Sequence, residues 1–240
     1  MTIRAVTFDA AGTLIAVAEP VGATYARVAA RHGIHVRADD VEHRFRAAFA
    51  AAPPLTFPGA NLVRIGNHER AWWYTVVRRA LGPAAAGTPL DAVFDELFAH
   101  YAGARAWQVF PEVPGLLAAL RARGLRLGVV SNFDARLGPL LDMLGVAPLM
   151  DTVVHSSRAG SAKPDPGIFR VALGRLGVTP GDALHVGDAP IEDVKGARGA
   201  GMRAALLDRH AGNAPAPADP PRECPVLASL SALPSVLEEV

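Results

Sequence analysis

Four charged residues of this sequence are well suited to chemistry: Asp9, Lys163, Asp188 and Asp193. A carboxylate that is held at the end of a strand can act as a nucleophile toward phosphorus or carbon. Carboxylate oxygens are also the hard ligands that Mg²⁺ prefers, and a lysine ammonium group offers a compact positive charge. Together these residue types could bind a divalent cation and an anion, provided that the fold brings them to one place.

The segments around these residues alternate between strand and helix. We predict strands over 3–8, 125–130, 151–155, 183–186 and 202–207, and helices over 112–123, 135–145, 166–176 and 190–200. A proline-rich surface loop is expected over 211–225, followed by a short strand and helix over 226–239. This alternation predicts an α/β fold, a Rossmann-like, doubly wound parallel sheet with helices on both faces.

The segment from residue 16 to residue 105 follows a different pattern. Apolar residues recur there at steps of three and four positions, which predicts helices over 21–33, 40–52, 67–82 and 90–103 and no strand. We therefore predict an all-α helical domain over 16–105. It interrupts an α/β core domain made of 1–15 and 106–240.

Polar residues stand just past the predicted strands of the core. In an open parallel sheet the ligand crevice lies at the carboxyl ends of the strands. The residues that the pattern places there are Asp9, Thr13, Ser131, Asn132, Asp188 and Asp193, with Lys163 just ahead of a helix. We expect these side chains to face a common site.

Four motifs that contain these residues resemble those of the haloacid dehalogenase superfamily. They are FDAAGTL at 8–14, VVSNF at 129–133, KPDPGIF at 163–169 and HVGDAPIEDVKGARGAG at 185–201. In one subfamily of this superfamily a helical cap domain lies between the first and second motifs, where this chain has its helical segment. The resemblance implies a hydrolase with a helical cap, acting on a small phosphorylated metabolite as a phosphatase.

The resemblance also implies a role for each matching residue. Asp9 would be the nucleophile that forms an aspartyl-phosphate, and Lys163 would balance the charge of Asp9 or of the substrate. Thr13, Ser131 and Asn132 would donate hydrogen bonds to substrate oxygens. Mg²⁺ would be bound by Asp9, Asp188, Asp193 and the backbone carbonyl of Ala11. For Asp193, a position behind the metal ligands or a charge at a helix N-terminus is the alternative.

The first motif departs from the pattern of the family's phosphatases. These have a second aspartate two residues after the nucleophile, which protonates the leaving group, but this chain has Ala11 there. A methyl group transfers no proton, and general acid–base catalysis typically contributes about 10²–10⁴-fold. The substrate could therefore have a good leaving group, or the proton could come from Glu19, His43 or Glu192.

Other functions within the superfamily also tolerate an alanine at this position. A 2-haloacid dehalogenase releases halide without a proton and uses no metal, although the acidic Gly187-Asp188 pair is unfavourable for it. A protein that keeps the fold for binding or as a scaffold, and a sugar-phosphate mutase, remain open. Phosphonoacetaldehyde hydrolase needs a lysine in its cap, and residues 16–105 contain none.

The composition excludes several other classes of protein. The 24 basic residues balance 23 acidic ones, which argues against binding to nucleic acid or to an anionic membrane. No apolar run approaches the roughly 18 residues of a membrane span, and the N-terminus is typical of a strand rather than of a signal peptide. We expect a cytoplasmic protein of undetermined oligomeric state. We also expect His185 to be a packed core histidine.

Overall fold

The computed structural model describes residues 2–61, 63–87, 90–209 and 224–239 and divides into two compact units. Unit 1 is Met1–Ala16, Thr56–Gly59 and Val109–Val240, and unit 2 is Val17–Leu55 and Ala60–Gln108. Unlike the domain predicted over 16–105, unit 2 excludes Thr56–Gly59, which belongs with unit 1. That unit 2 works as a cap remains a prediction.

Unit 1 is built on a six-stranded sheet with the order β5-β4-β1-β6-β7-β8. Its strands are β1 (Ala5–Phe8), β4 (Arg126–Ser131), β5 (Thr152–His155), β6 (Ala183–Gly187), β7 (Arg203–Leu207) and β8 (Val226–Leu227). All neighbouring strands are parallel. The central strands β1 and β6 are buried along their whole length, as expected for strands covered on both faces. The predicted parallel α/β sheet is confirmed.

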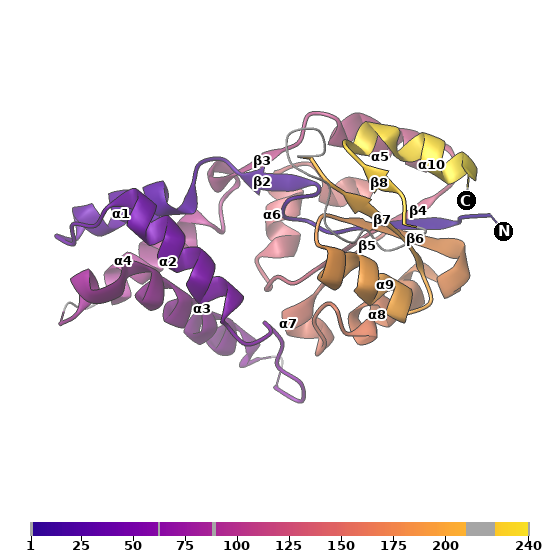
Figure 1. The fold of residues 1–240 in the computed structure, drawn as a ribbon. Helices are drawn as coiled ribbons and strands as arrows, with labels where there is room; N and C mark the ends of the chain where they lie inside the picture. Colours follow the sequence, from indigo (N-terminus) through magenta and orange to yellow (C-terminus); the bar gives the residue numbers. More distant parts are fainter. Residues whose placement is uncertain (1, 62, 88–89, 210–223, 240) are drawn as a thin grey trace. The chain divides into compact units, whose positions relative to one another are not determined.

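Helices cover both faces of this sheet (Figure 1). In the figure α5 (Val113–Ala122) and α10 (Leu233–Glu239) lie on one face, and α8 (Pro166–Leu176) and α9 (Gly196–Gly199) lie on the other. The shorter helices α6 (Leu137–Met143) and α7 (Ser156–Ala159) follow β4 and β5. The bounds of α8 have clear local causes. Asp165 accepts a hydrogen bond from the Gly167 N–H at its start, and Gly177 ends it in the left-handed conformation.

The register of the sheet brings the ends of three strands to one level. Phe8 of β1 lies opposite Val129 of β4 and Val186 of β6. Asp9 therefore follows directly at the carboxyl edge, where β4 and β6 also end. This edge is where side chains from distant parts of the chain can meet.

Two features differ from the predicted elements. The strands β2 (Ile15–Val17) and β3 (Trp107–Val109) form a separate two-stranded sheet that was not predicted, because three residues carry too little periodicity to be recognised. The helix predicted over 190–200 is a π-helical turn (Pro190–Lys195) followed by α9. A π-helical turn is a rare local form that is frequent at functional sites.

Unit 2 consists of helices that share an apolar core. They are α1 (Val21–Arg31), α2 (Ala38–Ala50), α3 (Ile65–Leu81) and α4 (Asp91–His100). Each begins and ends within a few residues of a predicted helix, and each contributes to one buried cluster, which includes Tyr25, Val41, Val77, Val93, Phe94 and Leu97. Short 3₁₀ turns occur in the two units at Gly82–Ala85, Ala104–Ala106, Ala147–Leu149, Pro180–Asp182 and Leu230–Ala232.

The proline-rich loop predicted over 211–225 lies outside the described residues, apart from its last two. Among the described residues, no helix combines the length and the apolarity that crossing a membrane requires.

Candidate active site

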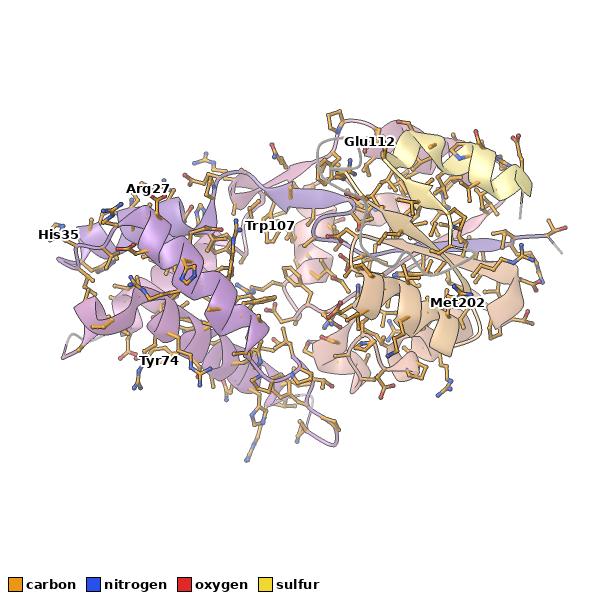
Figure 2. All side chains as sticks on the ribbon, viewed as in Figure 1. Arg27, His35, Tyr74, Trp107, Glu112 and Met202 are labelled. Carbon is orange, nitrogen blue, oxygen red and sulfur yellow. The ribbon has the colours of Figure 1, made fainter. Side chains whose placement is uncertain are left out.

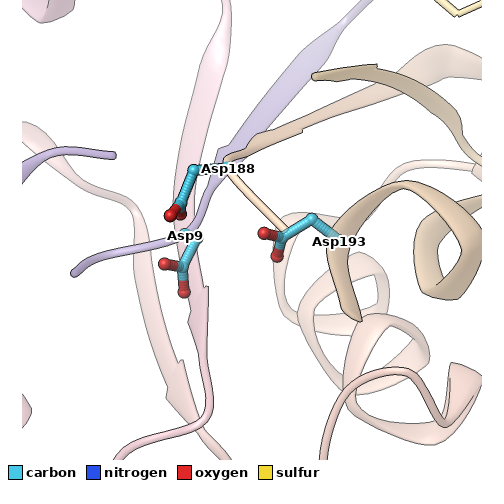
Figure 3. A group of neighbouring side chains, drawn as sticks. All are labelled: Asp9, Asp188 and Asp193. Atoms are coloured by element: carbon cyan, nitrogen blue, oxygen red, sulfur yellow. The ribbon is translucent and has the colours of Figure 1, made fainter. Parts of the chain in front are cut away.

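Three aspartates from separate segments of unit 1 meet at the carboxyl edge of the sheet (Figure 3). Asp9 directly follows β1, Asp188 directly follows β6, and Asp193 lies in the π-helical turn. One carboxylate oxygen of each lies within 4.8 Å of those of the other two. Asp9 and Asp193 are buried, whereas Asp188 is exposed. This spacing is what three ligands of one metal ion require.

Two glycines allow the carboxylates to approach the backbone this closely. A Cβ atom at Gly12 would lie 2.4 Å from Oδ2 of Asp188, and one at Gly187 would lie 2.2 Å from the Asp193 carboxylate. Gly12 also has a φ of +93°, which residues with a side chain rarely adopt. Any other residue at these two positions would displace an aspartate of the cluster.

Lys163 joins two of the aspartates. Its Nζ donates hydrogen bonds of 2.6 Å to Oδ1 of Asp9 and of 2.6 Å to Oδ1 of Asp193. The lysine side chain is only 3% exposed, so these charge-assisted bonds form away from water. Burial alone would lower the pKa of Lys163, but the charges of Asp9 and Asp193 raise it above its ordinary value. The ammonium group is therefore charged at neutral pH.

The cluster carries more negative charge than Lys163 can balance. With three carboxylates and one ammonium ionised, the sum of −3 and +1 is −2. Burial raises the pKa of Asp9 against the lowering effect of Lys163. Desolvation, followed by the charges of Asp9 and Asp193, raises the pKa of Asp188 to about 6. Burial opposes the ionisation of Asp193 as well, but Lys163 and His185 hold its pKa below the ordinary value.

The chemistry of this donor set fits Mg²⁺. Three carboxylates supply the hard oxygen ligands that Mg²⁺ prefers, and a divalent cation would balance the excess charge of −2. The exposed Asp188 leaves the cluster open toward solvent, from which an ion and a substrate could enter. The backbone carbonyl of Ala11, two residues after Asp9, remains a proposed fourth ligand.

The predicted hydrogen-bond donors differ in what they contact. Thr13 donates to Oδ1 of Asp188 at 3.2 Å. Asn132 pairs with the backbone of Lys163: its Nδ2 donates to the Lys163 carbonyl at 2.9 Å, and its Oδ1 accepts from the Lys163 N–H at 2.8 Å. Thr13 and Asn132 therefore orient charged residues of the cluster. Ser131 is buried at the end of β4, and its hydroxyl makes no hydrogen bond to another described residue, so this group is available to a ligand.

His185, in strand β6, contacts one of the three aspartates. It lies opposite Thr7 in the sheet, is fully buried and packs edge-on against Phe169. Its Nδ1 contacts the Thr7 hydroxyl at 2.9 Å, and its Nε2 contacts Oδ1 of Asp193 at 3.1 Å. The histidine packs in the core and also holds a carboxylate of the cluster. We did not predict this second role, although the position of His185 on the strand that leads to Asp188 was a signal for it.

The position of Ala11 offers no proton donor, and the predicted replacements differ in suitability. Glu19 accepts two hydrogen bonds from Arg27, at 2.8 and 2.5 Å. This pairing lowers the pKa of Glu19 to about 2, so Glu19 carries no proton at neutral pH. His43 is exposed on α2 in unit 2, and Glu192 is half-buried beside Asp193 in unit 1. Within the part of the chain that the structure describes, neither makes a contact that would assign it this role.

Comparison with known proteins identifies the family. The family model of the haloacid dehalogenase-like hydrolases matches residues 3–201, most of the chain. The chain belongs to this family. The hydrolase fold, with its parallel sheet and its four motifs in order, is the one that the sequence predicted.

The relatives of this hydrolase include proteins named for different reactions. Haloacid dehalogenase-like hydrolase domain-containing protein 3 of Mus musculus is 39% identical over 211 residues, 86% of this chain and 82% of the relative. A phosphoserine phosphatase of Thermus thermophilus is 35% identical over 70% of this chain and 74% of its own length. A solved 2-haloacid dehalogenase from Pseudomonas syringae is 29% identical, with a TM-score of 0.63 and 99% of both chains covered. The family thus includes both phosphatases and dehalogenases.

Proposed function

We propose that this hydrolase is a Mg²⁺-dependent phosphatase that acts on a small phosphorylated metabolite through an aspartyl-phosphate at Asp9. The observation that carries the proposal is the unbalanced cluster of Asp9, Asp188, Asp193 and Lys163. The displacement itself needs only one nucleophilic carboxylate, so we interpret the two further carboxylates as ligands of a cation. The phosphatase among the relatives supports the same chemistry.

Mg²⁺, held by Asp9, Asp188, Asp193 and the Ala11 carbonyl, would reduce the repulsion between Asp9 and a phosphate dianion. Asp9 then attacks phosphorus, a P–O bond to its carboxylate forms, and the bond to the leaving oxygen breaks with the electron pair going to that oxygen. Lys163 and Ser131 stabilise the charge on the phosphoryl oxygens. Water then attacks phosphorus, which releases phosphate and restores the Asp9 carboxylate.

The absence of a carboxylate at position 11 points to a class of substrate. A simple alkyl ester leaves as an alkoxide that must take up a proton, and Ala11 supplies none. An acyl phosphate or an ester of an acidic alcohol leaves as a stable anion and needs no such donor. We therefore propose that phosphates with good leaving groups are the preferred substrates.

Calorimetry with Mg²⁺, followed by a screen of acyl phosphates, aryl phosphates and alkyl phosphate esters, tests the proposal. We expect Mg²⁺ to bind to the wild type and not to an Asp188→Asn, Asp193→Asn double variant. Phosphate release should depend on Mg²⁺ and vanish in Asp9→Asn. Metal binding without turnover of any phosphate would indicate a binding protein instead of an enzyme.

One observation favours a second candidate, a 2-haloacid dehalogenase. Halide leaves without a proton, so Ala11 would not impair that reaction, and a solved relative at 29% identity carries this name. The same Asp9 carboxylate would attack carbon and displace the halide. Halide release from 2-chloropropionate in the presence of a metal chelator would establish this reaction in place of the phosphatase.

A further inference from the structure

Arg209 makes a set of contacts beside the site that no motif of the sequence indicates. It lies two residues after β7, in unit 1. Its Nε donates to the Gly12 carbonyl at 3.2 Å and its Nη2 to the Thr13 carbonyl at 2.8 Å. Its Nη1 donates to Oε1 of Glu112 at 2.7 Å. The guanidinium group thus bridges the loop after Asp9 and the start of α5, where Figure 2 labels Glu112.

The guanidinium group is itself held in place. Its Cζ lies 3.4 Å from the centre of the Phe110 ring, and the Arg209 side chain is 19% exposed. The partner Glu112 is equally shielded, with 18% of its side chain exposed. Burial opposes the ionisation of Glu112, but the hydrogen bond from Arg209 keeps its pKa below the ordinary value. A planar group fixed on three sides can hold two successive carbonyls in one orientation.

The two carbonyls belong to the loop that completes the aspartate cluster. Gly12 lies against the Asp188 carboxylate, and the Thr13 hydroxyl donates to that carboxylate. The preceding residue is Ala11, whose carbonyl is the proposed fourth metal ligand. The direction of the Ala11 carbonyl depends on the peptide plane between Ala11 and Gly12, and the Gly12 carbonyl lies in the next plane. Fixing the Gly12 and Thr13 carbonyls therefore restricts the backbone next to that ligand.

We propose that Arg209 is a positioning residue, which fixes the loop of Ala11, Gly12 and Thr13 beside Asp9 and Asp188 without touching the substrate. The inference rests on the proposed function in so far as the loop serves to bind Mg²⁺. Groups that orient metal ligands typically change metal affinity or activity by about 10–100-fold when they are removed. We expect the loss of the Arg209 guanidinium group to weaken Mg²⁺ binding or activity by a factor in this range.

The test compares Arg209→Met with Arg121→Met in the full chain. Methionine keeps an apolar side chain over Phe110 and removes every donor. Arg121 is a matched control, because it also donates to a backbone carbonyl, that of Leu149 at 3.1 Å, and to the Asp151 carboxylate at 3.4 Å. Neither contact involves a residue of the site. Both variants should remain folded at the temperature of the measurements.

Hydrogen exchange of the metal-free protein measures how strongly the backbone amides of the loop are protected. We expect amides 10–15 to exchange about tenfold faster in Arg209→Met than in Arg121→Met. Calorimetry should show Mg²⁺ binding about tenfold weaker, and kcat about 10–100-fold lower with KM changed by less than about threefold. Arg209→Lys should give intermediate values, because one ammonium group cannot reach both carbonyls and Glu112. If Arg209→Met does not fold, Arg209→Ala with added ethylguanidinium should recover the protection of the loop.

The outcomes separate this inference from the proposed function. Equal exchange of amides 10–15 in Arg209→Met and Arg121→Met overturns the positioning role, as does unchanged Mg²⁺ affinity in a folded Arg209→Met. A wild type that binds no Mg²⁺ but whose loop loses protection in Arg209→Met overturns the proposed function and leaves the positioning of the loop established.

Discussion

Two charge clusters of unit 1, each with at least one buried carboxylate, differ in how their charges are balanced. Asp134 is fully buried and accepts hydrogen bonds from the N–H, Nε and Nη2 of Arg136, at 2.9, 2.9 and 2.6 Å. One carboxylate there meets one guanidinium group. In the candidate active site, one ammonium group, that of Lys163, contacts two of the three carboxylates. The paired carboxylate is compensated by its own guanidinium group, whereas the cluster has excess negative charge that a further cation would balance.

Asp9→Asn tests the unbalanced cluster of the candidate active site. We expect it to change activity more than any other variant proposed here. Asparagine keeps the shape of the side chain but is not a nucleophile, so phosphate release should fall by more than about 10³-fold. Because burial raises the pKa of Asp9, its charge is unfavourable in the metal-free protein. The variant should therefore unfold at a urea concentration no lower than the wild type does. A variant that retains most of its activity would remove Asp9 from the mechanism.

Asp134→Asn tests how much the pair of Asp134 and Arg136 contributes to the stability of the fold. The change removes the negative charge that the guanidinium group of Arg136, whose side chain is only 12% exposed, contacts. Breaking a buried pair from one side typically costs about 3–5 kcal/mol of unfolding free energy, measured by urea titration. Asp142→Asn, at an exposed position of α6, is the matched control and should change nothing. A loss below about 1 kcal/mol would show that the pair is not the stabilising contact inferred here.

Ala11→Asp adds a fourth carboxylate to the unbalanced cluster and a proton donor to the reaction. Hydrolysis of alkyl phosphate esters should rise by about 10²-fold, because general acid catalysis becomes possible. The metal-free protein should become less stable, because the new charge is repelled by Asp9 and Asp188. Ala11→Asn is the control that has the same size and no proton to transfer. Equal ester hydrolysis by the two variants would mean that the leaving group already finds its proton elsewhere.

The sheet and most of the site were predictable from the sequence for the same physical reason. Alternating strands and helices require a parallel sheet, and residues that follow its strands must lie at one edge. Asp9, Ser131 and Asp188 are therefore expected at one edge of the sheet, whichever strands lie beside one another.

Contacts that depend on strand order could not be predicted. Arg209 also follows a predicted strand, which is the signal that could have drawn attention to it. Its reach to the Gly12 and Thr13 carbonyls depends on β7 lying next to β6, which in turn lies next to β1. The pairing of Asn132 with the Lys163 backbone likewise depends on how two distant loops fold together. A single sequence contains no periodic pattern for such contacts.

The smallest predicted effect concerns His155, which lies near the balanced pair. Burial, with help from Arg158, lowers the pKa of His155 to about 4, against the opposing charge of Asp134. The unfolded chain takes up a proton at an ordinary pKa of about 6.5, and the folded chain does so only near 4. Stability from this group is therefore present above pH 6.5 and is lost as the pH falls toward 4, by about 1 kcal/mol between pH 6.5 and 5.5.

The comparison of wild type with His155→Gln isolates this contribution. The raised pKa of Asp188, about 6, acts in the opposite direction, because the folded protein binds that proton more readily than the unfolded chain does. Both chains carry Asp188, so its effect cancels in the difference between their unfolding free energies. That difference, measured by urea titration at several pH values without metal, should decrease as the pH falls. A constant difference would mean that His155 titrates alike in the folded and unfolded chains, and that the surroundings of the balanced pair are more open to water than its burial indicates.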